Sequence, residues 1–544
     1  MKRCLYIILL LTMGYGCKTP TTPPSETSSA DAVFQGTIGS VTELIGYNDV
    51  RVQGYSLVLG LADTGSSECP PNIKKYLLQQ LRKLKNQDLL PAAYIDLDAE
   101  NIISSHSTAV VLVTGLVPAG APKRERFDLN VRALEGTQTT SLQGGFLMKT
   151  DLQIVVTRLS GRNIAARATA FAAGPIFINP FPISAQIGQK ADPRSGVVIG
   201  GGQTLYDRHV QLSLLQPDYR VAQQIQDRIN SRFIEPDSPK VAEATRSNVT
   251  LRIPKSYRDH YQHFFSLVWA LYLQDSPGYQ ENKLRELSEL AAQPSTDYET
   301  IALAWEAIGR PSLPLLQTFY RDTSSGELAF YAARTALNLN DQKAIDKLIS
   351  MALDNDHPAQ LKAAQELARV AQDLRARPAL AQLLNRDNYQ LRLLAYQGLR
   401  QTQDDRIRTC YPNKYFALDV VDSIGENIIC AWTTDEPRIV LFGKNLLCPQ
   451  NVFLESDDRR ITINSRTTDT HLSIIRQVSQ QQDFIKLQSS FLMEDLIKTL
   501  AQPLTAPDGK KVIGPGLNFS EIAGLLFHLC QQEIVAAKFK LHRL

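Results

Sequence analysis

Residues 51–67 of this chain read RVQGYSLVLGLADTGSS, an apolar run that ends in a polar loop. Glycines stand in it at Gly54, Gly60 and Gly65, with Gly46 just upstream. A strand followed by such a loop fits two alternatives, a phosphate-binding loop or a structural turn. The loop lacks the lysine of a phosphate-binding loop and the glycine spacing of a dinucleotide site, so the phosphate interpretation is the weaker one.

The N-terminus has the composition of an export signal followed by a tether. Lys2 and Arg3 precede a short apolar stretch that ends at Cys17, an arrangement typical of a secretory signal and too short to span a bilayer. We predict a signal peptide over 1–16, lipidation of Cys17 and a disordered tether over 17–32, rich in Pro, Thr and Ser. The alternative is an ordinary signal peptide with a chance cysteine.

The bulk composition is that of a multi-domain globular protein. The chain has 544 residues, of which 43% are hydrophobic and 21% charged, which is enough for about three or four domains. The formal net charge of +3 is too small to indicate a nucleic-acid partner.

The hydrophobic patterns divide the chain after the tether into four parts. A β-rich domain is predicted over 33–185, where FDLNVRALEG at 127–136 alternates with period two. A mixed α+β domain follows over 186–272 and an all-α segment over 275–408, and strands return in an α+β segment over 411–544.

The helical segment 275–408 carries a weak internal repeat. Similar motifs recur about every 30 residues, with a second apolar stripe between them, which favours HEAT-like paired helices. An irregular helical bundle is the alternative. Elsewhere we predict a helix over 72–84, a capping box from Asn518 and Glu521, and a flexible turn at the three glycines 200–202.

The search for chemistry favours a protein that is not an enzyme. Asp63-Thr64-Gly65 resembles half of an aspartic protease site, but no second copy follows to share the proton. His260 and His263 have the spacing of metal ligands on a helix, yet no third ligand lies nearby in sequence, so packing histidines are favoured. We predict no catalytic residue, no metal and no cofactor.

Cysteine usage suggests one disulfide. In an exported chain, Cys430 and Cys448 are the favoured pair, since the segment between them has the pattern of two strands around a turn. The odd number of cysteines after the tether leaves at least one thiol free.

Several blocks, taken in order, resemble the flagellar basal-body P-ring protein family. They are GYSLVLGLADTGSS, STAVVLVTGLVPAGAPKRERFDLNVRALEGTQTTSLQGGFLMKT, HVQLSLLQPDYRVAQQIQDRINSRF and EPRIVLFGKNLLCPQNVFLESDDRRITI. The resemblance spans most of 40–272 and 411–544. The segment 275–408 has no counterpart in the family and therefore looks like an insertion. The chain departs from the family at Ser66, where the family has Asp, and at 117–119, which replaces Pro-Pro-Phe.

The resemblance implies a P-ring-like core, mostly β and mixed, interrupted by the helical insertion. It implies a structural subunit that forms a homo-oligomeric ring around the flagellar rod in the periplasm, near peptidoglycan and the L ring. It makes Gly54, Gly60, Gly65, Gly144 and Gly145 signature positions of that core. By neighbourhood alone, it suggests that four basic side chains face the rod, namely Lys74, Lys75, Lys83 and Lys85.

Two functions follow as hypotheses. The first is a P-ring subunit, lipid-anchored to the outer membrane, whose insertion binds a further protein. The second is a tethered envelope adaptor that reuses the P-ring fold and binds its partner through the helical repeats.

Overall fold

The computed structural model describes residues 33–542 apart from short gaps. The residues outside the description are 1–32, 62, 88, 91, 155–166, 179–191, 235–238, 294–296, 322–325, 414–415, 434–435, 457–458, 478–483, 504–515 and 543–544. The predicted signal peptide, the tether and Cys17 lie outside the described residues. The described part is α+β, as predicted, and none of its helices combines the length and apolarity that crossing a membrane requires.

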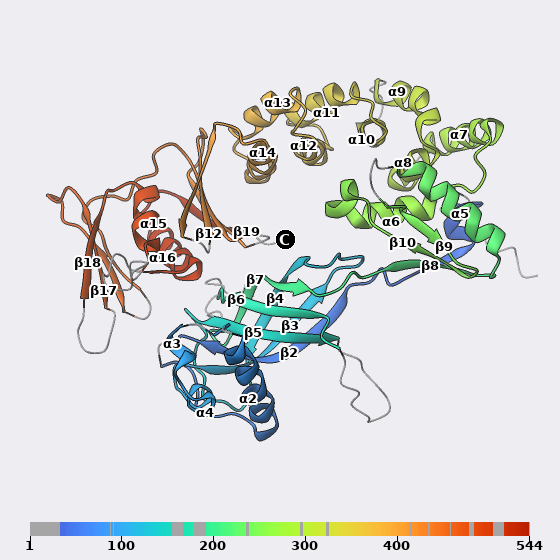
Figure 1. The fold of residues 1–544 in the computed structure, drawn as a ribbon. Helices are drawn as coiled ribbons and strands as arrows, with labels where there is room; N and C mark the ends of the chain where they lie inside the picture. Colours follow the sequence, from blue (N-terminus) through green and yellow to red (C-terminus); the bar gives the residue numbers. More distant parts are fainter. Residues whose placement is uncertain are drawn as a thin grey trace, which may run out of the picture.

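Six antiparallel strands close into a barrel in the order β2-β3-β4-β7-β6-β5 (Figure 1). The predicted alternation in β4 is confirmed, since Phe127, Leu129 and Val131 are buried in the barrel core and their neighbours are exposed. The strands are β2 (Val50–Leu59), β3 (Ala109–Val117), β4 (Arg126–Ala133), β5 (Phe146–Ile154), β6 (Ala170–Pro175) and β7 (Ser195–Thr204).

The second half of β2, residues 56–59 of the opening sequence, is buried on both faces. Val58 belongs to the barrel core, whereas Leu57 and Leu59 pack in a second cluster against the predicted helix, which is α2 (Pro71–Asn86). A strand that is covered on both sides is apolar throughout, which explains why this run does not alternate. Two short helices, α3 (Ala92–Ile95) and α4 (Ala99–Ile103), accompany α2 outside the barrel (Figure 1).

The turn predicted at the three glycines 200–202 is wrong, because these residues lie within β7. A Cβ atom on Gly202 would lie 2.5 Å from the Phe127 ring, and one on Gly201 would lie 2.2 Å from a Val198 methyl group. Gly201 and Gly202 are therefore needed for close packing inside the barrel, whereas Gly200 has left-handed backbone, with φ of +57°.

A second, four-stranded sheet lies beside the barrel in the order β1-β8-β10-β9. The strand β1 comes from the predicted domain 33–185 but belongs to this second sheet. Conversely, β7 comes from the predicted domain 186–272 but belongs to the barrel, so each of the two predicted domains contributes a strand to the other unit. The Asp218 carboxylate caps the helix α5 of this unit, accepting from Arg220 N–H. The elements are β1 (Thr42–Ile45), β8 (Val210–Leu214), α5 (Tyr219–Arg232), β9 (Ala242–Ala244), β10 (Asn248–Leu251) and α6 (Tyr261–Ala270).

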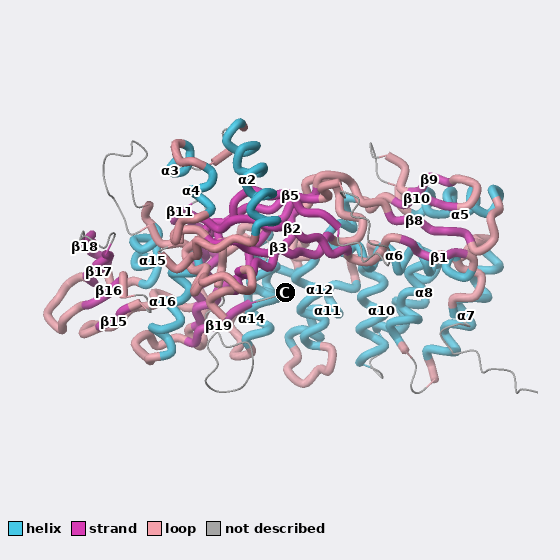
Figure 2. Tube along the Cα trace, turned by 90° about the horizontal axis from the view of Figure 1, so that it is seen from below, coloured by secondary structure: helices cyan, strands magenta, loops and turns pink. Residues whose placement is uncertain are grey.

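The described residues between 277 and 401 form a succession of helices joined by turns. The helices form an arch in two rows, and α8, α10, α12 and α14 make the row nearer the barrel (Figure 1). Seen from below, α10, α11 and α12 run side by side (Figure 2). They are α7 (Pro277–Ala291), α8 (Tyr298–Ile308), α9 (Leu313–Arg321), α10 (Gly326–Asn338), α11 (Ala344–Leu353), α12 (Gln360–Arg369), α13 (Ala376–Leu383) and α14 (Tyr389–Gln401).

One turn recurs along this array. Asp341 Oδ1 accepts from Lys343 N–H at 3.1 Å, and Asp373 Oδ1 accepts from Arg375 N–H at 2.9 Å. After α14 the same bond forms between Asp404 and Arg406 at 3.0 Å. These turns recur at the near-constant spacing of the sequence motifs, as stacked helical repeats require.

The C-terminal part combines two sheets with two helices. The five-stranded sheet has the order β11-β12-β14-β13-β19, and the smaller sheet has the order β15-β16-β17-β18. The predicted capping box of Asn518 and Glu521 is present at the start of the last helix. The elements are β11 (Ile407–Asn413), β12 (Phe416–Val421), β13 (Ile428–Trp432), β14 (Arg438–Phe442), β15 (Phe453–Glu455), β16 (Ile461–Asn464), β17 (Leu472–Gln477), β18 (Phe484–Ser489), α15 (Met493–Ala501), α16 (Phe519–Gln531) and β19 (Lys538–His542).

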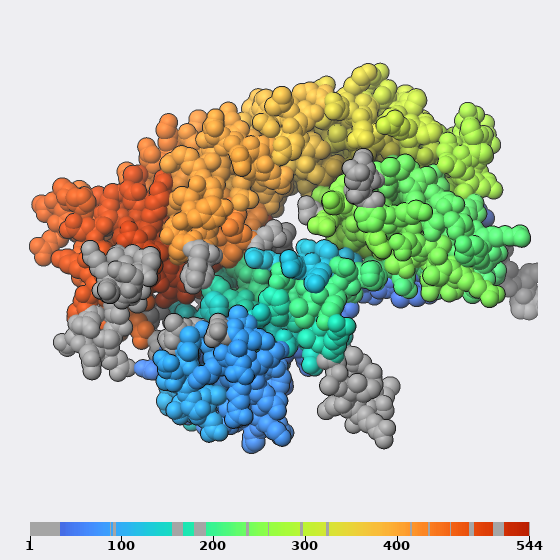
Figure 3. All heavy atoms as spheres, in the orientation of Figure 1, coloured from blue at the N-terminus to red at the C-terminus, as the bar shows by residue number. Residues whose placement is uncertain are grey.

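The C-terminal part returns to touch the barrel. The rings of Phe177 and Phe519 lie 5.4 Å apart, and Ile178 N–H donates to Ser520 Oγ at 3.1 Å. The barrel, second sheet, helical arch and C-terminal sheets therefore follow one another around a circuit that this contact completes (Figure 3).

Candidate functional site

The loop after β2 is a structural turn. The N–H of Gly65 donates to His106 O at 2.9 Å, and the N–H of Ser66 donates to Thr108 O at 2.9 Å. A phosphate-binding loop needs its backbone N–H groups free to face the ligand, whereas these two are satisfied inside the protein. Of the two alternatives for this loop, the structural turn is therefore correct and the phosphate-binding loop is not.

Close contacts with neighbouring atoms explain three of the signature glycines. A Cβ atom would lie 2.0 Å from Thr108 O at Gly65, 2.6 Å from Asp151 O at Gly54, and 2.3 Å from a Val58 methyl group at Gly145. The other two have left-handed backbone, with φ of +79° at Gly60 and +74° at Gly144. All five positions thus favour glycine for structural reasons.

The four lysines proposed to face the rod lie on α2, and their surroundings differ. Lys75, Lys83 and Lys85 are exposed, and Lys74 is half-buried. The Lys83 ammonium group lies 3.2 Å from an Asp151 carboxylate oxygen of the barrel. Lys83 is therefore already paired, and Lys75 presents its charge to solvent without a partner among the described residues.

His263 belongs to a buried polar contact between α6 and α8. Its Nε2 lies 2.9 Å from Oε1 of Glu306, a side chain with 4% exposure, and Asn338 donates to the other carboxylate oxygen at 3.0 Å. Burial raises the pKa of the Glu306 carboxyl group, but the hydrogen bonds and charge of His263, with Asn338 and Arg232, outweigh it and lower the pKa. This agrees with the packing interpretation, and the described residues contain no cluster of three or more His, Cys, Asp or Glu able to hold a metal.

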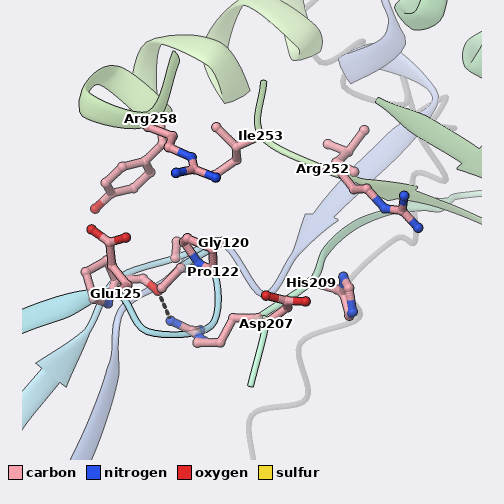
Figure 4. A pocket seen from close by; sticks show the side chains of 14 residues that line it. Gly120, Pro122, Glu125, Asp207, His209, Arg252, Ile253 and Arg258 are labelled. Carbon is pink, nitrogen blue, oxygen red and sulfur yellow. Dashed lines mark hydrogen bonds between the residues drawn. The ribbon is translucent and has the colours of Figure 1, made fainter. Parts of the chain in front are cut away.

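A cavity of about 260 Å³ lies where the barrel meets the second sheet (Figure 4), and we call it the junction pocket. Its floor is apolar, built from the β3–β4 loop, which includes Gly120 and Pro122, and from Ile253. Its rim carries charged and polar side chains from both units. These are Glu125, Asp207, His209, Arg252, Arg258 and Tyr261.

Arg208 holds the two sides of this junction together. Its guanidinium group donates to Val117 O and Pro118 O at 2.7 and 2.6 Å, and to Asn48 O at 2.9 Å. Burial lowers the pKa of Arg208, while nearby Asp49 raises it. Three backbone acceptors from two connecting segments make Arg208 a clamp on the relative position of the barrel and the second sheet.

The barrel and the second sheet are similar to known proteins. Residues 37–279 match the family model described as the flagellar P-ring protein. Over these residues the chain is similar to the flagellar P-ring family.

The curated relatives agree with this assignment at low identity. Flagellar P-ring proteins are 28% identical over 232 residues in Geobacter metallireducens and 26% identical over 239 residues in Helicobacter pylori strain J99. The aligned segments are 41% and 42% of this chain, and 57% and 60% of those proteins. The chain thus spans little more than half the length of the relatives it matches. The predicted P-ring resemblance is confirmed for this part, and the relatives' names describe a ring component of the flagellum, not an enzyme.

The P-ring match covers the barrel and the second sheet, and it ends inside α7, where the helical array begins. The signature glycines and the junction pocket lie within the match. The resemblance that the sequence suggested for 411–544 lies outside it.

The predicted disulfide is not formed in the structure. Cys430 and Cys448 are both free and buried, and they belong to different hydrophobic clusters. Cys430 instead lies 3.3 Å from the Tyr389 hydroxyl group of α14, while the predicted strands between the two cysteines are present as β13 and β14. Burial raises the pKa of each thiol to about 11.

Sequence reasoning missed Arg208 and the junction pocket. Arg208 directly precedes HVQLSLLQPDYRVAQQIQDRINSRF, a block considered only for its resemblance to the P-ring family. The one available signal was an arginine directly before a buried strand, and it does not say which carbonyl groups lie within reach. The pocket joins residues about 130 positions apart in sequence, from Gly120 to Ile253, so no local pattern reveals it.

Proposed function

We propose that this chain is a structural subunit of the flagellar basal-body P ring, which polymerises around the rod in the periplasm. The observation that carries the proposal is the P-ring match over residues 37–279, which contains the whole closed barrel. A closed barrel has no open sheet edge, so it is a rigid body that keeps its shape in an assembly. The satisfied backbone of the signature loop fits a structural role.

The proposal includes a position in the cell envelope. Cleavage after the apolar N-terminal stretch and lipidation of Cys17 would anchor the subunit to the outer membrane through the tether. The exposed basic side chains of α2, above all Lys75, would face the rod. The subunit would neighbour peptidoglycan and the L-ring proteins.

We further propose that residues 275–408 are a HEAT-like insertion that binds another protein of the basal body. The repeated Asp turns support a repeat array, and the P-ring match stops where the array starts. Stacked helical pairs offer long surfaces that suit protein partners.

Purified hook–basal bodies from the native organism test the main proposal. They are probed with an antibody against residues 275–408, beside a strain that lacks the gene. The protein should travel with the basal body, and the deletion should remove the ring and motility. Intact rings and normal swimming without the protein would contradict the proposal.

The second hypothesis is an envelope adaptor that reuses the P-ring fold. It is favoured by the short match, which leaves the helical array and the C-terminal sheets without counterparts in the matched part of the relatives. The same experiment separates the two, since an adaptor would leave basal bodies unchanged and would co-purify with other envelope proteins.

A further inference from the structure

The loop between β12 and β13 presents an unusually exposed apolar side chain. Ile424 is 79% exposed, more than any other large hydrophobic residue that the structure describes. It stands between two acidic residues, Asp422 and Glu426. Its N–H donates to the Asn385 side chain at 2.8 Å, so the backbone beneath it is tied to the α13–α14 turn.

A buried arginine fixes the shape of this loop. Arg392 of α14 is 0% exposed and donates to Glu426 O at 2.7 Å and to Ser423 Oγ at 3.0 Å. Its guanidinium carbon lies 5.2 Å from the centre of the Phe442 ring. Burying a guanidinium group is costly unless its hydrogen bonds are made. The loop is therefore held in one conformation while Ile424 remains in solvent.

A rigid loop with an exposed aliphatic tip has the character of an interface anchor. Binding energy concentrates on a few apolar or aromatic groups that fill pockets, and pre-organised groups lose less entropy on binding. The loop thus presents a projecting aliphatic side chain that is suited to insertion into an apolar cavity of a partner.

The junction pocket has the complementary form. Its floor is apolar, and its volume of about 260 Å³ accommodates an aliphatic side chain with part of its backbone. Arg258 and His209 are exposed at the rim, on the side of the second sheet and α6. The acidic rim residues are Glu125 and Asp207, and Asp207 already accepts from Lys123 N–H at 2.7 Å.

We propose that Ile424 of one copy inserts into the junction pocket of a second copy, with Asp422 beside Arg258. Arg252 of the rim is already paired with Glu243 at 3.1 Å, so the pairing of Asp422 with Arg258 gives the contact its orientation. Glu426 contributes less, because its carboxylate is bound by Lys538 at 2.7 Å. This inference rests on the proposed ring function and names the two surfaces that would join neighbouring subunits.

The two surfaces are unlike, which decides the kind of assembly. The loop belongs to the C-terminal sheet and the pocket to the P-ring-like part, and no residue lines both. A contact between unlike surfaces is head-to-tail and builds a ring or a filament, whereas a symmetric contact stops at a dimer.

The test measures the mass distribution of the full-length mature protein by sedimentation velocity over a range of concentrations. Ile424→Asp should weaken self-association about tenfold or more. Ile234→Asp is the matched control, because Ile234 is an equally prominent isoleucine, 77% exposed, outside the loop. It should leave association unchanged.

A cross-link places the contact. Protein carrying Ile424→Cys is mixed with protein carrying Pro122→Cys, and oxidation should join one copy of each, while neither variant alone forms the same product. Arg258→Glu in the protein that carries Pro122→Cys should abolish the cross-link. Adding Asp422→Lys to the protein that carries Ile424→Cys should restore it.

The results separate this inference from the proposed function. Assembly that survives Ile424→Asp without a cross-link overturns the inference and leaves the ring function standing. A wild-type protein that stays monomeric and gives no cross-link overturns it as well. Absence from purified basal bodies contradicts the ring function, whatever the cross-link shows. A cross-link in that case supports a head-to-tail oligomer of another assembly.

Discussion

Substitution of Asp419 by Asn should destabilise the boundary between the helical arch and the C-terminal sheet. Asp419 is 0% exposed in β12. Its Oδ2 accepts from Tyr396 Oη at 2.5 Å and from Arg438 Nη1 at 2.9 Å, and it lies 3.3 Å from Arg400 Nε. Two of these partners come from α14, so the carboxylate joins helix to sheet.

The magnitude follows from the burial of the remaining partner. Arg438 has a side chain 5% exposed, and without the Asp419 charge it keeps only Glu436, at 2.6 Å. Leaving a buried charge without its partner costs about 3–5 kcal/mol. Glu436→Gln is the matched control, because that carboxylate is 46% exposed and such a pair contributes about 0–1 kcal/mol.

Hydrogen exchange read by mass spectrometry is the suitable assay, because a chain of several units need not unfold in one step. A loss of about 3 kcal/mol speeds exchange through local opening by about 100-fold or more in peptides from α14 and β12. Barrel peptides should exchange as before. Adding Arg438→Met to Asp419→Asn should recover much of the loss, since an apolar replacement removes the unpaired charge.

One result would refute this reasoning. If Asp419→Asn accelerates exchange no more than Glu436→Gln does, the buried network does not hold the helical arch to the sheet.

Three further predictions concern other parts of the molecule. Gly65→Ala should lower the thermal midpoint far more than Gly60→Asn, since a Cβ at Gly65 meets a carbonyl oxygen at 2.0 Å whereas the one at Gly60 meets nothing within 4 Å; thermal denaturation decides. The pKa of the Glu306 carboxyl group is lowered in the folded state, so its contribution to stability is present above its unfolded pKa of about 4.3 and is lost as the pH falls through the folded value. When the pH is lowered from 7 to 3, the urea midpoint of Glu306→Gln should therefore fall less steeply than that of the wild-type protein. Cys430 and Cys448 should resist a thiol reagent until urea unfolds the protein, and a reductant should leave the thermal midpoint unchanged.

The parts of the fold that obey a local period were predictable from sequence. The stripe of Leu77, Leu81 and Leu84 predicts α2, and the Asn518 side chain marks the start of α16. In these cases one face is buried and the other is wet, so the pattern carries the answer. The same holds for β4.

The features that sequence reasoning missed depend on distant partners. Gly202 lies in a strand where Phe127, 75 residues away, occupies the space that a side chain would take. The Cys430 thiol contacts the Tyr389 hydroxyl group of α14, a residue 41 positions away. The predicted disulfide was argued from the neighbouring strands alone, which carry no sign of this contact. The exposed Ile424 depends on a buried arginine that no sequence period marks.

The buried charges share a location that bears on function. Glu306 lies between α6 and the helical arch, Arg392 lies between α14 and the β12–β13 loop, and Asp419 and Arg438 lie between α14 and the C-terminal sheet. Two buried charges of the described residues are exceptions, since Asp341 and Lys283 lie inside the arch. An enzyme gathers such groups in a cavity where they meet a substrate, whereas here they fix the orientation of one unit against the next. A buried charged contact weakens when its geometry shifts, so these contacts favour one orientation of each unit against the next.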